Sequence, residues 1–285
     1  MMPQNAPQFT NFGEAVQFFY KFYSASAPDR FERYLTAAGG RHLDAVVLYR
    51  WNLELCEALL PSLHAAELTL KNAIHQAMVK HYVTQAKPHF PAGSLPDDWW
   101  YPHFQDGSRP DDWWFESEFE GQRFLKLQDL GKVKDVVAQL EKASKKVTTP
   151  RVVADLSFGF WVELLNSNYT ESIVVPTLLT TMKNLPADKK TQGWLRDNFG
   201  KLRDLRNRVG HHEPIFQRND LRDLRKMAWN TANEIQQFFV YPIHPMCRFK
   251  EVAAADLKAQ AGALKGRLEK DWYEPYKKKE EAADA

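Results

Sequence analysis

Apolar residues recur at intervals of three and four positions along most of this chain, and this spacing constrains the fold more than any other sequence feature. Because an α-helix has about 3.6 residues per turn, residues spaced in this way form one apolar face. The spacing predicts a helix over residues 43–60 and another over 63–82, separated by a kink or tight turn at Pro61. The residues that carry it are Leu48, Trp51, Leu55, Leu59, Leu63, Ala66, Leu70, Ile74, Ala77 and Met78.

Helical signals continue along most of the remaining chain. A helix over residues 28–37 is expected to end at Gly39-Gly40, a pair suited to left-handed backbone, and Thr149-Pro150 suits an N-cap followed by the first helical residue. No segment shows the alternation typical of a strand. We therefore predict an all-α fold, a multi-helix bundle. Its further helices are expected over residues 9–23, 119–143, 152–165, 191–210 and 219–240.

Residues 84–117 break the helical pattern with five prolines and two glycines, and we expect a long Trp/Pro-rich loop insertion there. The loop contains a duplication, because Pro-Asp-Asp-Trp-Trp occurs at residues 96–100 and again at 110–114. Exposed tryptophans can stack on nucleic-acid bases, but the flanking aspartates would repel the phosphates. We favour a lid packed on the helices.

The chain has 285 residues and 44% apolar content, enough to bury a substantial core. We expect one α-helical domain over residues 1–245, then a charged helical extension and tail over 246–285 with a helix at 250–270. No run of about 18 apolar residues occurs, and the N-terminus lacks a signal-peptide pattern. A cytoplasmic protein without membrane contact is expected. Cys56 and Cys247 form no CxxC pair and are expected to be reduced thiols.

Charge is distributed unevenly, although the net charge is only +2. Residues 189–226 hold eleven Lys or Arg against five Asp or Glu, whereas residues 97–120 hold eight Asp or Glu against one Arg. A basic segment can attract phosphate, but a solvated helix face gives the same count. A more specific feature has to distinguish a phosphate-binding surface from a solvated helix face.

That feature is the run Arg-Asn-Arg-Val-Gly-His-His at residues 206–212. Arg206 falls at the edge of the apolar stripe of the helix expected over 191–210, so we expect it to be partly exposed. Five helical residues span about 500° of rotation, so Arg206 and His211 can cooperate only if the helix ends or bends near Gly210. We expect it to end there, with His211 or His212 turning back toward Arg206. The stripe contains Trp194, Leu195, Asn198, Leu202, Leu205 and Val209.

An arginine beside a histidine suits cleavage of RNA by its own 2′-hydroxyl. Imidazole exchanges protons near neutral pH, and guanidinium offers forked donors to phosphate oxygens. Asn207 can bond the phosphate or fix an imidazole tautomer. The alternative is that Arg206 caps helix carbonyls and the histidines only complete a turn. Neighbouring histidines point apart and no HxxxH or HExxH spacing occurs, so we expect no metal site and no cofactor.

The run at 206–212, with Glu213-Pro214-Ile215-Phe216 after it, resembles the RNxxxH-type motif of the HEPN superfamily, and within it the bacterial Abi-like (abortive infection) proteins. Two upstream blocks are similar to blocks of that family in the same order, so the resemblance covers about residues 45–240. Lys71 stands where an arginine is expected, and Gly210 where alanine is more usual. The blocks are Glu67-Leu68-Thr69-Leu70-Lys71-Asn72-Ala73-Ile74 and Leu156-Ser157-Phe158-Gly159-Phe160-Trp161.

The resemblance implies a HEPN-like bundle, often a homodimer whose second subunit completes the cleft. It implies a metal-independent endoribonuclease of phage abortive infection or toxin-like growth inhibition, leaving a 2′,3′-cyclic phosphate and a 5′-hydroxyl. Arg206 and His211 carry over as the catalytic pair, with Asn207 and His212 in support. RNA is then the substrate, and a neutralising or sensing protein is a candidate partner. Within the basic segment, Arg203 and Arg208 are the expected RNA contacts.

A competing interpretation is a catalytically silent HEPN-like module that binds RNA or a protein partner in a defence system. One further residue bears on the site. Glu67 lies within an apolar stripe and needs a partner, either Arg206 or His211 across the bundle or another Arg or Lys. Residues 158–161 are expected in the core, where Gly159 would allow a close helix contact.

Overall fold

The computed structural model describes residues 28–86, 114–116, 118–119, 122–257, 259, 262–263 and 266. Helix makes up 76% of them, and their strands are the two-residue pair β1 (Glu118–Phe119) and β2 (Gln122–Arg123), which form an antiparallel hairpin. The all-α prediction is therefore confirmed. No helix in this part of the chain has the length and apolar content needed to cross a membrane. The helix expected over 9–23 and the end of the tail lie outside these residues.

The chain divides into two compact units. Of the described residues, unit 1 comprises 28–60, 206–221 and those from 246 onward, and unit 2 comprises 61–205 and 222–245. Residues beyond 245 thus group with the beginning of the chain. The single domain expected over 1–245 stays a prediction.

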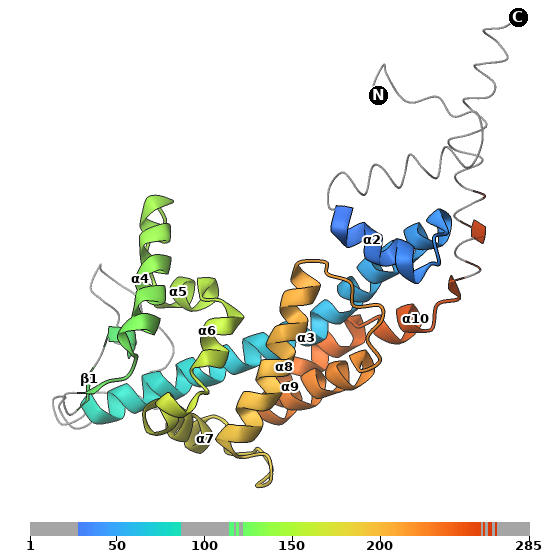
Figure 1. The fold of residues 1–285 in the computed structure, drawn as a ribbon. Helices are drawn as coiled ribbons and strands as arrows, with labels where there is room; N and C mark the ends of the chain where they lie inside the picture. Colours follow the sequence, from blue (N-terminus) through green and yellow to red (C-terminus); the bar gives the residue numbers. More distant parts are fainter. Residues whose placement is uncertain are drawn as a thin grey trace, which may run out of the picture. The chain divides into compact units, whose positions relative to one another are not determined.

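The longest element is α3 (His42–Ala86), a 45-residue helix that Figure 1 shows as one uninterrupted ribbon from blue to cyan. The two helices expected on either side of Pro61 are therefore one helix, and the tight turn expected there is wrong. A proline inside a helix removes one backbone hydrogen bond and crowds the preceding turn, at a cost of about 3 kcal/mol. Burial of the apolar face on both sides of Pro61 offsets that cost: Leu55, Leu59, Leu63, Ala66 and Leu70 are all buried.

In unit 1, α2 (Pro28–Ala37) has the predicted bounds and ends in the predicted way. Gly39 and Gly40 both have left-handed backbone, with φ of 62° and 80°. The amide of Gly40 donates to the Leu35 carbonyl at 3.0 Å, which closes the helix end. The buried ring of Tyr34 meets Tyr49 of α3 edge-on, with centroids 5.3 Å apart. These contacts attach α2 to the first part of α3.

The segment beyond residue 246 also packs on the first part of α3 within unit 1. The short helix α10 (Phe249–Ala253) buries Phe249, and its Val252 carbonyl accepts a 2.9 Å hydrogen bond from Trp51 Nε1. Arg248 Nη2 lies 2.7 Å from Glu57 Oε1. The helix expected over 250–270 is interrupted, because Ala254, Ala255 and Asp256 are not helical.

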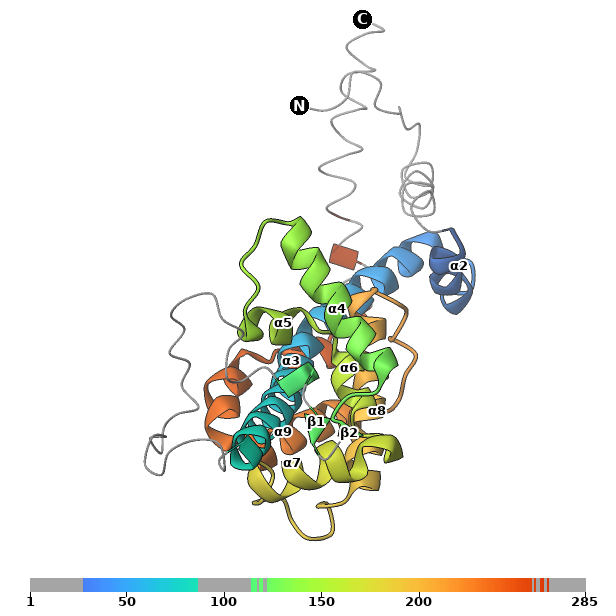
Figure 2. The same ribbon diagram turned by 90° about the vertical axis from the view of Figure 1, so that its left-hand side faces the viewer.

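Unit 2 holds most of the remaining elements. The helix expected over 119–143 begins later, at α4 (Leu127–Lys142), because the β1–β2 hairpin occupies its first residues. Figure 2 shows the chain returning from the far end of α4 to α5 (Thr149–Asp155) through residues 143–148. After α6 (Phe158–Glu163) come η3 (Ser167–Tyr169), η4 (Thr170–Val174), α7 (Val175–Thr180), α8 (Gln192–Gly210), α9 (Leu221–Ile243) and η5 (His244–Met246), with α8 and α9 extending into unit 1.

The single helix expected over 152–165 is divided. Leu156 and Ser157 have extended backbone, and the Ser157 hydroxyl caps α6 by accepting from the Phe160 amide at 3.2 Å. Similarly, the N-cap of α5 is Thr148 rather than Thr149. Phe158, Phe160 and Trp161 are buried as predicted. A Cβ on Gly159 would lie 3.6 Å from Ser157 Oγ and 3.9 Å from Arg203 Cδ, so close packing does not require this glycine.

Trp114 and Phe115, at the end of the segment expected to form a loop insertion, are buried. Trp114 begins the short turn η2 (Trp114–Glu116), stacks on Phe115 with centroids 4.4 Å apart, and donates from Nε1 to His75 Nδ1 of α3 at 3.1 Å. Burial lowers the pKa of His75 to about 4, which keeps the imidazole neutral and able to accept. Trp114 is thus packed on a helix, as expected for a lid. The first copy of the repeat, residues 96–100, lies outside the described residues.

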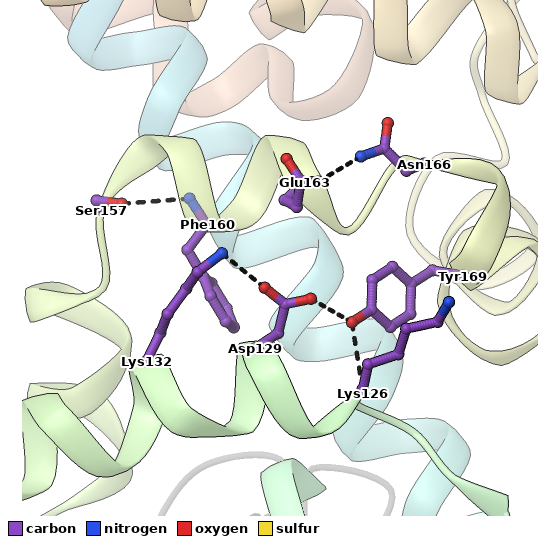
Figure 3. Close-up of polar contacts among 8 residues, drawn as sticks. All are labelled: Lys126, Asp129, Lys132, Ser157, Phe160, Glu163, Asn166 and Tyr169. Carbon is purple, nitrogen blue, oxygen red and sulfur yellow. Dashed lines mark hydrogen bonds and ion pairs between the residues drawn. The ribbon is translucent and has the colours of Figure 1, made fainter.

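A buried carboxylate joins α4 to η3 (Figure 3). Asp129 lies in the first turn of α4, where the helix dipole favours a negative charge, and Tyr169 donates its hydroxyl hydrogen to Asp129 Oδ2. The same hydroxyl accepts from the Lys126 amide at 3.2 Å, and Lys132 Nζ lies 2.7 Å from Asp129 Oδ1. Burial and the bond to Asp129 raise the pKa of Tyr169, so the phenol remains a neutral donor.

We expect Tyr169→Phe to lower the free energy of unfolding by about 1 to 3 kcal/mol, because it deprives a buried carboxylate and a backbone amide of one partner each. Urea denaturation measures the loss. Tyr241→Phe is the matched control, since Tyr241 is 83% exposed and should change stability little. Equal effects of the two substitutions would show that the Asp129 contact contributes nothing.

We expect the pH dependence of stability to report on His75. Its folded pKa of about 4 lies below the ordinary 6.5, so the unfolded chain binds the extra proton between these values. Its contribution is complete well above pH 6.5 and is lost as the pH falls toward 4, by about 3 kcal/mol. His75→Asn, whose amide oxygen can still accept from Trp114, should flatten this dependence. His64→Asn, at an exposed position of the same helix, should leave it unchanged.

Candidate functional site

The candidate site lies at the C-terminal end of α8. Thr191 starts this helix, since its hydroxyl accepts from the Trp194 amide at 3.2 Å and its carbonyl from the Leu195 amide at 3.1 Å. Arg206 is half-buried at the edge of the apolar stripe, as predicted. Of the predicted stripe, Leu195, Leu202, Leu205 and Val209 are buried, whereas Trp194 and Asn198 are half-buried. Phe199, which the prediction did not include, is buried as well.

The helix ends at Gly210, as predicted, but a different residue makes the turn. Gly210 is helical, and the left-handed residue is His212, with φ of 51°. The His212 amide donates to the Val209 carbonyl at 3.1 Å, and the Glu213 amide to the Arg208 carbonyl at 2.8 Å. This pair of bonds is the Schellman pattern that closes helix ends. The turn that exposes the two histidines is therefore a defined helix terminus.

His212 occupies a position that usually belongs to glycine. Left-handed backbone costs a residue with a Cβ about 1 to 2 kcal/mol, although histidine tolerates it better than bulky or branched residues. Two other helix ends of the same pattern in the described residues have Gly39 and Ser144 at this position. A histidine held in this conformation is therefore strained relative to glycine. Because strained residues cluster at functional sites, the side chain of His212 is a candidate for a functional role.

Asn52 of α3 holds the chain immediately after this turn. Its side chain is fully buried, and its Nδ2 donates to the Glu213 carbonyl at 3.1 Å. Its Oδ1 accepts from the amides of Ile215 at 2.7 Å and Phe216 at 3.2 Å. Asn52 is not among the site residues predicted from the sequence. Its signal was present, because Asn52 lies four residues after Leu48 and three before Leu55, on the apolar face of its helix.

Packing reinforces the same segment. Ile215 is fully buried, and the ring of Phe216 stacks on Tyr34 of α2 with centroids 4.9 Å apart and 24° between the planes. The connection between α8 and α9 can be followed in Figures 1 and 2. All of these contacts lie within unit 1. The segment after the two histidines is thus anchored by both hydrogen bonds and apolar contacts.

The site residues predicted from the sequence differ in exposure. Asn207, Arg208, His211 and His212 are exposed. The Nη1 atom of Arg206 lies 3.7 Å from the position that a Cβ on Gly210 would take, so the guanidinium extends along the last turn of the helix, and an alanine at 210 would fit. The last turn therefore presents a half-buried arginine together with exposed imidazoles.

The two arginines expected to contact RNA have acidic neighbours. Arg203 donates from Nε and Nη2 to Asp204 Oδ1 at 3.1 and 2.9 Å. Arg208 Nη1 lies 3.6 Å from Glu213 Oε2, in a pair with both side chains well exposed to solvent. Exposed pairs of this kind contribute about 0 to 1 kcal/mol. Each arginine is thus weakly held and can exchange its carboxylate for another anion.

Glu67 lies in unit 2, on α3, and is half-buried. Lys71 follows one helical turn later on the same face and is buried, with its Nζ 3.4 Å from the Ala154 carbonyl. A carboxylate four residues before a lysine is a favourable arrangement, which agrees with the alternative that Glu67 pairs with another Arg or Lys. The pairing of Glu67 with Arg206 or His211 stays a prediction.

Among the described residues, no group of three or more His, Cys, Asp or Glu side chains is placed to hold a metal ion. No protein-family model, curated protein or solved structure matches this chain. The residues of the 206–212 run and their geometry are therefore the basis for any assignment of function.

We expect His212→Gly to raise the free energy of unfolding by about 0.5 to 1 kcal/mol. The substitution relieves the strain of left-handed backbone, and the greater conformational entropy of glycine in the unfolded chain cancels part of that stabilisation. Ser144→Gly, at the equivalent position of α4 with φ of 54°, is the matched comparison and should behave in the same way. Urea denaturation measures both. A loss of stability in His212→Gly alone would mean that the imidazole makes stabilising contacts that outweigh the strain.

Proposed function

We propose that this protein is a metal-independent endoribonuclease of the HEPN type, with Arg206 and His211 as its catalytic pair. The observation that carries the proposal is the RNxxxH run at a closed helix end, where a half-buried arginine and an exposed histidine follow one another within about one and a half turns. The similarity to Abi-like proteins in the upstream blocks supports it. A HEPN-like bundle belongs to the same proposal.

The chemistry needs no group beyond those of the chain and the RNA. His211 takes the proton from a 2′-hydroxyl, whose oxygen attacks the adjacent phosphorus. Arg206 stabilises the negative charge that builds on the phosphate oxygens. The bond to the 5′-oxygen breaks, and that oxygen takes a proton, with His212 as the nearest second carrier in sequence. The products are a 2′,3′-cyclic phosphate and a 5′-hydroxyl.

Binding of RNA is assigned to the arginines around the pair. A phosphate binds an arginine guanidinium more strongly than the carboxylate of an exposed ion pair does, because the charged phosphate oxygens accept forked hydrogen bonds. Arg203 and Arg208 would exchange Asp204 and Glu213 for phosphates of the substrate. Asn207, exposed one residue after Arg206, would orient the phosphate.

The biological setting belongs to the same proposal. An endoribonuclease of this kind would act in the cytoplasm, in phage abortive infection or as a toxin-like growth inhibitor. The resemblance further suggests a homodimer in which a second subunit completes the cleft, and a neutralising or sensing protein that restrains the activity. Glu67 is proposed as a support for the pair.

We expect Arg206→Ala and His211→Ala each to reduce RNA cleavage at least 100-fold, the usual contribution of a catalytic acid or base being about 10²- to 10⁴-fold. The protein is purified from uninfected and from phage-infected cells, and each preparation is incubated with mixed RNA in EDTA. The chemical groups at the ends of the products are then identified. Arg196→Ala and His64→Ala are the matched controls, because both residues are exposed and neither belongs to the run. These controls should cleave at the wild-type rate.

Two outcomes would contradict the proposal. Cleavage that requires an added divalent metal would overturn the mechanism. RNA binding that survives both substitutions, with no cleavage by wild-type protein in any preparation, would favour a catalytically silent HEPN-like binding module instead.

A further inference from the structure

The peptide groups on either side of Glu213 are both held by hydrogen bonds. On one side, the Glu213 amide donates to the Arg208 carbonyl at 2.8 Å and closes the end of α8. On the other side, the Glu213 carbonyl accepts from Asn52 Nδ2 at 3.1 Å. His212 immediately precedes this residue and has the unfavourable φ of 51°. The residue that follows this strained backbone is thus held on both sides.

Asparagine is the side chain that these three partners require. The Glu213 carbonyl needs a donor, whereas the amides of Ile215 and Phe216 need an acceptor. A carboxamide supplies both from one rigid group, whereas a carboxylate has no hydrogen to donate and an alkyl side chain satisfies none of the three. Because Asn52 is fully buried, water cannot replace it.

Asn52 also links the site to a rigid support. It belongs to the 45-residue helix α3, with Leu55 and Leu59 buried on the same face. A turn attached to such a helix presents its side chains with less freedom than a turn exposed to solvent, and catalysis depends on groups held in position before reaction.

We propose that Asn52 is a positioning residue for the two histidines: by fixing residues 213–216 it keeps His212 in left-handed backbone and so sets the direction of His211 and His212. This inference rests on the proposed ribonuclease function for its catalytic consequence. Its structural content, the restraint of the turn, is independent of any activity.

The catalytic test compares Asn52→Ala with Leu55→Ala, a core substitution one turn further along the same helix that lowers stability but removes none of the hydrogen bonds to residues 213–216. Both are assayed on RNA at a temperature where circular dichroism shows each fully folded. We expect Asn52→Ala to lower kcat at least 10-fold with KM within about 2-fold of wild type, and Leu55→Ala to leave both unchanged. Asn52→Asp, which keeps the acceptor and loses the donor, should cleave at an intermediate rate. Equal kcat values for Asn52→Ala and Leu55→Ala would overturn the inference while leaving the ribonuclease proposal intact.

A second test requires no RNA. Amide hydrogen exchange in the full chain should accelerate at least 10-fold at Ile215 and Phe216 in Asn52→Ala relative to Leu55→Ala, and Asn72→Ala, at an exposed position of α3, should match wild type. The shift in urea midpoint caused by His212→Gly should be smaller in the Asn52→Ala background, where the turn is already released. Unchanged exchange, or the same shift in both backgrounds, would overturn the inference.

The two tests keep the proposals separate. If wild-type protein cleaves no RNA and Arg206→Ala is indistinguishable from it, the ribonuclease proposal fails. Faster amide exchange in Asn52→Ala would then still support the restraint of the turn by Asn52. Unchanged exchange would overturn that inference too.

Discussion

The carboxamide of Asn52 is buried, and each polar group left without a partner there would cost about 1 to 3 kcal/mol. Three of its hydrogen bonds go to the backbone of residues 213–216, so the segment after α8 is bound to α3 through both a donor and an acceptor. The Schellman bonds of α8, the stacking of Phe216 on Tyr34 and the strained backbone of His212 all lie next to this segment. The position of the histidines is therefore determined by a residue that lies about 160 positions earlier in the chain.

Unit 2 uses buried polar groups in the same way. Tyr169 and Lys132 satisfy the carboxylate of Asp129, and His75 accepts the indole hydrogen of Trp114. In each case polar contacts join segments that lack the length to bury a large apolar face, such as η3 and η2. Apolar burial supplies most of the stability, whereas these contacts select one arrangement of the short segments.

Charge at the end of α8 is balanced by neighbouring residues. The excess of positive charge over residues 189–226 suggested a surface open to phosphate. In the structure, Arg203 and Arg208 meet Asp204 and Glu213, and Arg196 and Arg218 meet Asp197 and Asp220. Exposed pairs of this kind are weak enough to exchange. The proposed RNA contacts thus involve replacing one anion by another, which would make binding sensitive to ionic strength.

By itself, the sequence determined the helical class, the bounds of α2, the end of α8 at Gly210 and the burial of residues 158–161, because apolar periodicity and glycine signals act over a few residues. It also singled out Arg206 and His211 as neighbours at a helix end. Only the tertiary structure decided that α3 passes through Pro61 without a break, since burial on both sides offsets the cost of the proline. It alone showed that His212 makes the turn and that Asn52 holds it. Those outcomes depend on contacts between residues far apart in the chain, and local spacing carries no information about such contacts.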